Sequence, residues 1–183
     1  IILVERSENA LFEIHCELQR RFPEIEAIPC VADVTDVPRI RALFARYRPT
    51  TVFHAAAHKH VPLMEENPEE AVLVNTGGTA HLIEFARTVA ADRFVLISTD
   101  KAVAPTNVMG ATKKLAELLV RHAQANGGST RFMTVRFGNV LGSQGSVIPI
   151  FREQLERGET LTITDPKVTR YFMTVPEAVE LVI

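Results

Sequence analysis

The order of short apolar runs and amphipathic segments constrains the fold of this chain most. Apolar runs of four to eight residues predict buried strands, and most segments between them repeat apolar residues at helical spacing. Strands that alternate with helices form βαβ units, whose strands are parallel. The sequence therefore predicts an α/β fold with a doubly wound parallel sheet. The predicted strands are Ile1–Val4, Ile25–Val31, Thr51–His54, Phe94–Ile97 and Thr130–Phe137.

Polar residues and prolines mark the ends of the predicted helices. Asp36 or Thr35 can cap a helix that ends before Pro49, and Asn107 precedes a long helix that ends near Gln124. A third helix is predicted over 67–91, with Asn67 as its cap and a glutamate three residues later. Two glycines in its interior, at 77 and 78, indicate either close packing or a bend. Thr174 and Glu177 have the spacing of a capping box.

Composition excludes several classes of protein. The 183 residues include 20 basic and 22 acidic side chains, a balance that argues against nucleic-acid binding or attachment to a membrane surface. Cys16 and Cys30 lack the spacing of metal ligands, and free thiols are typical of a reducing cytoplasm. No apolar run is long enough to span a bilayer. We therefore expect a cytoplasmic location.

The chain begins inside a predicted strand and ends within a helical pattern, and it contains no Gly-x-Gly-x-x-Gly motif. An alternating chain with an acidic residue at a strand end suggests a dinucleotide-binding, Rossmann-like domain. We expect residues 1–137 to form such a domain without its first strand and Gly-rich loop. Residues 138–183, where the pattern changes, are expected to be part of a small substrate-binding region.

Several residues at the predicted strand ends are candidates for binding NAD or NADP. Glu5 could bind the adenosine ribose, although a solvated turn explains it equally well. Glu5 would repel a 2′-phosphate, whereas Arg6 and Ser7 could bind one, so NAD is slightly favoured. Small side chains would let the cofactor approach the backbone after the Thr51–His54 strand. The remaining candidates are Asp33, Val34, Ala55, Ala56 and Ala57.

The richest cluster of reactive side chains follows the apolar run Phe94–Ile97. Thr99, Asp100 and Lys101 come directly after it, and ligands bind at the carboxyl ends of strands in open α/β sheets. Met109 and Lys113 are four residues apart and share a helix face. His54, His58 and His60 are close in sequence but lack a cysteine or carboxylate ligand at typical spacing, so we predict no metal site.

Several blocks of the sequence resemble one enzyme family over the whole chain. The blocks Ser98–Lys101, Pro105–Lys113, His54–Pro62, Arg136–Val140 and Thr169–Thr174 are similar to nucleotide-sugar 4,6-dehydratases of the extended short-chain dehydrogenase/reductase superfamily. The similarity is greatest to the group that acts on UDP-N-acetylglucosamine in polysaccharide and glycan biosynthesis. It implies a UDP-sugar substrate, a homo-oligomeric intact protein and, in long relatives, an amino-terminal membrane region.

The resemblance also implies roles for the clustered side chains. Asp100 would be the acid toward the carbon 6 hydroxyl and Lys101 the base at carbon 5. Thr99 would hydrogen-bond the carbon 4 oxygen, and Lys113 would hold the nicotinamide ribose. Asn75 would organise water near the site. Candidate substrate-binding residues are His58, Lys59, Asn139, Ser143, Ser146 and Arg170.

Met109 departs from the superfamily pattern, which places a tyrosine there to take the proton of the carbon 4 hydroxyl. A thioether has no proton to exchange. Either Thr99 with a water or Lys113 must then act as the base. Two alternatives to the dehydratase remain: an epimerase acting on a similar sugar nucleotide, and a cofactor-binding protein without catalysis. The Asp100–Lys101 pair favours elimination. The 183-residue chain alone is expected to be inactive.

Overall fold

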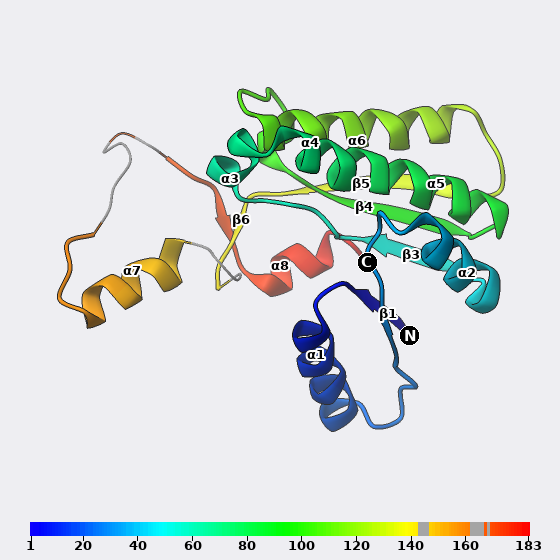
Figure 1. Ribbon diagram of the computed structural model, residues 1–183, viewed down its shortest axis with the longest axis horizontal. Coiled ribbons are helices and arrows are strands. Elements are labelled where there is room, and N and C mark those ends of the chain that lie inside the picture. Colours follow the sequence, from blue (N-terminus) through cyan, green and yellow to red (C-terminus); the bar gives the residue numbers. More distant parts are fainter. Residues whose placement is uncertain (143–146, 162–166, 168) are drawn as a thin grey trace.

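The computed structural model describes residues 1–142, 147–161, 167 and 169–183. Two sheets form the centre of the α/β architecture, and all their strand pairs are parallel, as predicted (Figure 1). One sheet pairs β1 (Ile2–Glu5) with β2 (Ile28–Val31). The other has the order β3 (Thr51–His54), β4 (Arg93–Thr99), β5 (Arg131–Phe137).

Strands β1 and β3 are not paired with each other. Among the described residues, no strand hydrogen-bonds the free edge of either one. In a doubly wound sheet these two edges flank the first strand, so this separation agrees with the prediction that the 183 residues lack that strand. The open edges leave apolar side chains in solvent, including Val4 at 43% and Phe53 at 58% exposure.

The helices surround these sheets in the order expected from the sequence. Helices α5 (Thr79–Thr88) and α6 (Val108–Ala125) pack together over the three-stranded sheet, and α2 (Val37–Tyr47) packs against α5 (Figure 1). Helix α1 (Glu8–Arg21) packs on β1 and β2. As predicted, the side chains of Asp36 and Asn107 cap α2 and α6, each accepting a backbone N–H.

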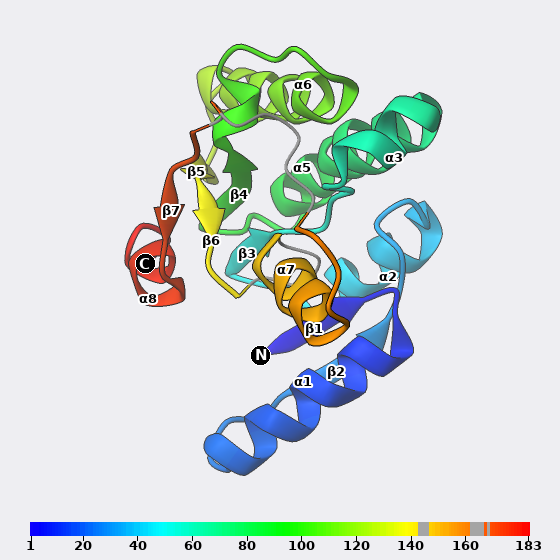
Figure 2. The same ribbon diagram turned by 90° about the vertical axis from the view of Figure 1, so that its left-hand side faces the viewer.

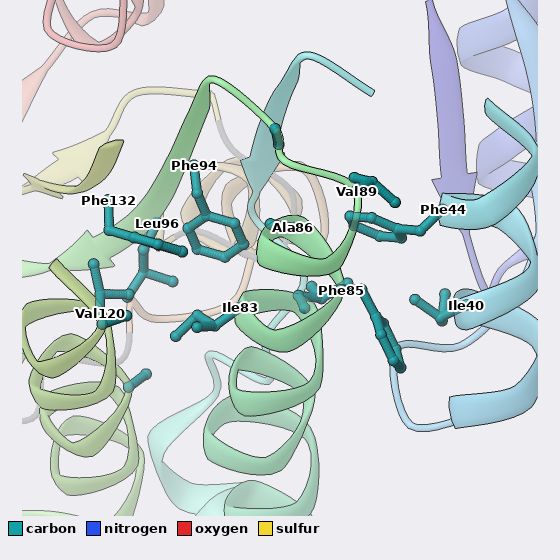
Figure 3. Close-up of a cluster of buried hydrophobic side chains, with 14 of the residues drawn as sticks. Ile40, Phe44, Ile83, Phe85, Ala86, Val89, Phe94, Leu96, Val120 and Phe132 are labelled. Atoms are coloured by element: carbon teal, nitrogen blue, oxygen red, sulfur yellow. The ribbon is translucent and has the colours of Figure 1, made fainter. Parts of the chain in front are cut away.

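The main core lies between α2, α5, α6 and the three-stranded sheet. Phe94 and Leu96 of β4 are fully buried there, which confirms the prediction of a buried strand (Figure 3). The rings of Phe94 and Phe132 lie 5.6 Å apart, and those of Phe44 and Phe85 lie 5.8 Å apart. Burying such side chains stabilises the fold by roughly 1.5–3 kcal/mol each. This packing fixes the carboxyl end of β4, where the candidate site lies.

The segment predicted as one helix over 67–91 is divided in the structure. It consists of α4 (Pro68–Ala71), the π-helix η1 (Val72–Gly78) and α5. A Cβ on Gly78 would lie 2.8 Å from the Val34 side chain, so both alternatives for the glycine pair, close packing and irregular helix, occur. Asn67 is the N-cap residue of α4, as predicted, but its side chain makes no capping hydrogen bond and instead donates to the Leu63 carbonyl at 2.8 Å. That carbonyl belongs to α3 (Val61–Glu66), a helix not predicted from the sequence.

The residues after Gly138 form a separate group of elements. Strand β6 (Asn139–Val140) pairs in parallel with β7 (Phe172–Met173), and Figure 2 shows the two side by side. Helices α7 (Val147–Glu156) and α8 (Val175–Glu180) accompany them, and the capping box predicted for α8 is present. In the part of the chain that the structure describes, no helix combines the length and apolar character needed to cross a bilayer.

Candidate active site

The side chains predicted to be catalytic meet where β4 ends. The chain turns there into the short helix η2 (Asp100–Ala102), which Thr99 caps through its hydroxyl. The Thr99 hydroxyl donates to Asp100 Oδ1 at 2.9 Å, and Lys101 Nζ donates to the same oxygen at 3.1 Å. Lys101 Nζ also lies 3.4 Å from Asn139 Oδ1 on β6. The cluster therefore joins β4 to the elements after Gly138.

The contacts of Asp100 favour its ionised form. Burial alone would raise the pKa of this carboxyl, but hydrogen bonds from Lys101 and Thr99 and the charge of Lys101 lower the pKa below its ordinary value. The site at rest therefore holds a carboxylate paired with an ammonium group. To act as an acid, Asp100 must first gain a proton, and to act as a base, Lys101 must first lose the one that it carries.

Lys113 is the second cation of the site and lies deep in the protein. It is 5% exposed, and its Nζ donates to the Ile97 carbonyl of β4 at 2.7 Å. Burial lowers the pKa of Lys113 to about 8, although the negative charge of Glu117 opposes that shift. Lys113 is therefore mostly protonated at neutral pH, yet it lies much closer to neutrality than an exposed lysine.

The structure adds a group to the site that we did not assign from the sequence. Glu117 is 8% exposed and accepts hydrogen bonds from Ser98 Oγ at 2.7 Å and from Arg136 Nε at 2.8 Å and Nη2 at 2.6 Å. Ser98 precedes Thr99, and Arg136 belongs to β5. The spacing of four between Lys113 and Glu117 was the signal that could have identified this residue.

Met109 has a packing role besides facing the site. It is 3% exposed and forms a small apolar cluster with Met64 and Ala71, and it also lines the cavity beside Lys113. A tyrosine hydroxyl at this position could exchange a proton, whereas the thioether only fills space. Met109 therefore contributes apolar contacts and no titratable group to this part of the cavity.

Asn75 is predicted from the resemblance to organise water, but its contacts in the structure are to protein. It is 1% exposed and lies in η1. Its Oδ1 accepts from the His58 N–H at 2.8 Å, and its Nδ2 donates to the His58 carbonyl at 3.1 Å and to Thr112 Oγ1 at 3.0 Å. Asn75 therefore ties the loop after β3 to helix α6.

We expect Asn75→Ala to destabilise the full-length protein by roughly 3 kcal/mol, because it removes three hydrogen bonds and leaves the partly buried N–H and carbonyl of His58 without their partner. Asn67→Ala is the matched control, since exposed Asn67 makes one hydrogen bond to the Leu63 carbonyl. Its cost should stay below about 1 kcal/mol. Urea unfolding of both variants tests this. If both variants lost the same free energy of unfolding, the hydrogen bonds of Asn75 would not stabilise the protein more than the single bond of Asn67.

The side chains of His54 and His58 near β3 contact protein groups. His54 is 3% exposed, and its Nε2 lies 2.9 Å from Thr79 Oγ1. Burial and the nearby charge of Lys113 lower the pKa of His54 to about 3, so it is neutral. His58 Nε2 lies 3.2 Å from Glu70 Oε1. Within the described ranges, no group of three or more histidine, cysteine or acidic side chains could hold a metal ion.

A cavity of about 450 Å³ opens over the end of β4. It brings together most of the predicted catalytic and substrate-binding residues, and its lining includes Thr99, Lys101, Met109, Lys113, His58, Lys59, Asn139 and Arg170. Because Asp100 is hydrogen-bonded to Thr99 and Lys101, it lies beside this lining. Ser143 and Ser146 fall outside the described residues.

A second cavity of about 210 Å³ lies at the ends of β1 and β2. Its lining contains every residue predicted to bind the cofactor except Ser7 and Lys113, namely Glu5, Arg6, Asp33, Val34, Ala55, Ala56 and Ala57. Ser7 instead caps α1, and its N–H donates to Glu5 Oε1 at 2.8 Å. Arg6 lies 3.7 Å from Asp33. The two cavities share Ala55, Ala57 and His58, so an elongated ligand could occupy both.

A family model described as "Polysaccharide biosynthesis protein" matches residues 1–183. The chain is 53% identical over 184 residues to the probable polysaccharide biosynthesis protein EpsC of Bacillus subtilis, covering all of this chain and 31% of that relative. It is also 42% identical over 134 residues to the UDP-glucose 4-epimerase of Rickettsia rickettsii, covering 72% of this chain and 39% of the epimerase. The chain thus spans about a third of the length of these curated relatives.

Solved structures share the fold. Pen from Bacillus thuringiensis superimposes with a TM-score of 0.89 at 36% identity, over 98% of this chain and 55% of Pen. A double mutant of DesIV, the dTDP-glucose 4,6-dehydratase of Streptomyces venezuelae, was solved with NAD and has a TM-score of 0.81 at 19% identity. That match covers 98% of this chain and 60% of DesIV. At 19% identity, this second likeness concerns the fold alone.

Proposed function

Since the chain belongs to the polysaccharide biosynthesis protein family, we propose that it carries the active site of a nucleotide-sugar 4,6-dehydratase. The substrate proposed is UDP-N-acetylglucosamine, and the product is a 4-keto-6-deoxy sugar nucleotide. One observation carries this proposal: Asp100 and Lys101 form an adjacent acid–base pair, 3.1 Å apart, at the cavity. Epimerisation at carbon 4 needs no second acid and base, whereas loss of water across carbons 5 and 6 needs both.

The fit to a dinucleotide rests on the two adjoining cavities. Carboxylates at the ends of β1 and β2 suit the adenosine half, and buried Lys113 with the Ile97 carbonyl suits the nicotinamide ribose. The small side chains Ala55–Ala57 lie between them and leave room for a ligand beside the backbone. When bound, NAD would accept a hydride from carbon 4 and later return it to carbon 6.

Thr99 and Asp100 offer a path for the proton of the carbon 4 hydroxyl. The Thr99 hydroxyl already donates to Asp100 Oδ1 at 2.9 Å, so it can pass its own proton to the carboxylate as it accepts one from the sugar. Asp100 is ionised at rest and can receive this proton. The pair then serves in place of the tyrosine that Met109 replaces.

Protonation of Asp100 prepares the elimination step. Neutral Asp100 can give its proton to the departing carbon 6 hydroxyl, which leaves as water. Lys101 is then no longer paired with a carboxylate, so it can release its proton to solvent and take the one on carbon 5. The proton from oxygen 4 thus leaves with oxygen 6, and Lys101 later returns a proton to carbon 5. Lys101 finally takes a proton back from solvent, so the site ends with the charges that it had at the start.

On the substrate side, we propose that Asn139 and Arg170 bind the nucleotide diphosphate with help from Lys59 and His58. All four line the larger cavity. Guanidinium and amide donors suit phosphate oxygens. We assign Ser143 and Ser146 to the same task from the sequence alone.

The proposed cofactor is NAD rather than NADP. Glu5 ends β1 with its carboxylate held by the Ser7 N–H, where it would repel a 2′-phosphate, and Asp33 partly neutralises Arg6. Glu5→Ala should therefore lower the ratio of NADP to NAD dissociation constants by about tenfold. Calorimetric titration of the full-length protein measures both constants. Asp33→Asn, which frees Arg6, should change the ratio in the same direction. A wild type that prefers NADP would contradict this assignment.

The function is tested by incubating the full-length protein with NAD and UDP-N-acetylglucosamine. A dehydratase forms a 4-keto product that carries a methyl group at carbon 6, both visible by NMR. The second candidate is an epimerase, favoured by the 42% identity to the Rickettsia epimerase. An epimerase would keep the carbon 6 hydroxyl and invert carbon 4. A catalytically silent cofactor-binding protein would bind NAD and leave the sugar unchanged.

A further inference from the structure

Glu117 connects three elements beneath the site, yet the proposed reaction does not use it. Its carboxylate accepts from Ser98 on β4 and receives two hydrogen bonds from Arg136 on β5, and it lies on α6 one turn after Lys113. Only 8% of Glu117 is exposed. A buried carboxylate is costly unless donors compensate it, and these three donors do so.

We propose that Glu117 is a positioning residue that fixes the end of β4 and keeps Lys113 protonated, with Arg136 moderating its charge. Lys113 then acts as a hydrogen-bond donor, which leaves Thr99 and Asp100 to receive the proton from oxygen 4. This inference rests on the proposed function only for the chemical role of Lys113. The arrangement of Glu117, Ser98 and Arg136 stands without it.

The geometric part follows from where the hydrogen bonds end. Ser98 is buried and directly precedes Thr99, and the carbonyl before Ser98 accepts from Lys113. One carboxylate thus holds the strand at Ser98 while Lys113 of the same helix holds it at Ile97. Both bonds come from α6, so helix and strand cannot shift without breaking one of them.

The electrostatic part follows from the charges around Lys113. Glu117 is the acidic group that raises the pKa of Lys113 against its burial. Among the described residues, the other titratable groups around Lys113 and Glu117 include no unpaired carboxylate. They are His54 of β3, His58, Lys59 and His60 of the following loop, the Asp100–Lys101 pair of η2, Lys114 of α6, Arg136 of β5 and Arg170. Without Glu117, burial would act on the ammonium of Lys113 with no negative charge to oppose it.

Three substitutions separate the geometric role of Glu117 from its electrostatic role. Glu117→Gln removes the charge and should lower the pKa of Lys113 by roughly one pH unit. Arg136→Met leaves the carboxylate without its compensating cation and should raise that pKa. Ser98→Ala removes a hydrogen bond but no charge, so it should weaken the hold on β4 while the pKa of Lys113 stays unchanged.

Competitive acetylation measures the pKa without any substrate or cofactor. The full-length protein is labelled with trace acetic anhydride across pH 6 to about 10, a range that spans neutral and ordinary lysine values, and mass spectrometry follows Lys113. Lys167, on a segment after α7, is the reference lysine. We expect a midpoint near pH 8 in the wild type and shifts of opposite sign in the first two variants.

An unchanged midpoint in Glu117→Gln, or shifts of the same sign in Glu117→Gln and Arg136→Met, would overturn the electrostatic part. If Ser98→Ala changed the pKa of Lys113 as much as Glu117→Gln does, the loss of a hydrogen bond and not the loss of charge would account for the shift. Because no turnover is measured, these outcomes do not depend on the dehydratase assignment. A failed sugar assay with opposite shifts would reject the function and leave this inference standing.

Discussion

Lys101→Ala in the full-length protein is expected to abolish dehydration, with a loss of at least about a thousandfold, while oxidation at carbon 4 continues. Lys101 pairs with Asp100 at 3.1 Å beside the cavity, where it can reach a sugar proton, and alanine leaves nothing to remove it. The variant should also lose the exchange of the carbon 5 proton with deuterium from solvent. NADH absorbance in single-turnover reactions and NMR in deuterated water measure the two steps separately.

Lys114→Ala is the matched control for this experiment. Lys114 lies on α6 next to Lys113 and lines a groove different from the catalytic cavity. The Lys114→Ala substitution changes the net charge by the same amount as Lys101→Ala, and we expect the variant to keep normal turnover. If Lys101→Ala instead turned over normally, or lost hydride transfer together with dehydration, Lys101 would not be the base at carbon 5.

The fold could be predicted from the sequence where local patterns and packing agree. Strand β4 contains the uninterrupted apolar run Phe94–Ile97, and the capped helices α2 and α6 carry their start signals in single residues, Asp36 and Asn107. The helix α3 was missed because Val61–Glu66 is short, so it offers hardly two turns of periodicity. Asn67 precedes α4 as predicted, but its side chain accepts no N–H of that helix and is held by the bond that it donates to the Leu63 carbonyl of the preceding helix.

The residues of the candidate site could be predicted better than their connections. Thr99, Asp100 and Lys101 are polar residues that follow an apolar run, which predicts a strand end. The structure brings their side chains together. The bonds of Asn75 and Glu117 reach residues between 17 and 37 positions away, and no local pattern encodes such distances. Their roles depend on how α6 packs against β4 and η1, which only tertiary structure defines.

At Gly110 a tertiary contact opposes the general preference of helices for alanine over glycine. This glycine lies in the first turn of α6, where alanine normally stabilises a helix by up to about 1 kcal/mol relative to glycine. However, a Cβ at this position would lie 2.6 Å from the Lys101 carbonyl oxygen and 3.3 Å from Asn107 Oδ1, the oxygen that caps the helix. The first of these distances is too short for real atoms, so the backbone of η2 or of α6 must move.

We therefore expect Gly110→Ala to lower kcat by roughly a hundredfold, because a displacement near 1 Å moves Lys101 out of reach of the sugar. It should also destabilise the protein by about 1–3 kcal/mol, as overpacked sites do. Gly77→Ala is the matched control, since its added Cβ would meet only a carbonyl oxygen at 3.8 Å. Steady-state kinetics and urea unfolding test both variants. If Gly110→Ala were as stable and active as Gly77→Ala, the contact between α6 and η2 would not position Lys101.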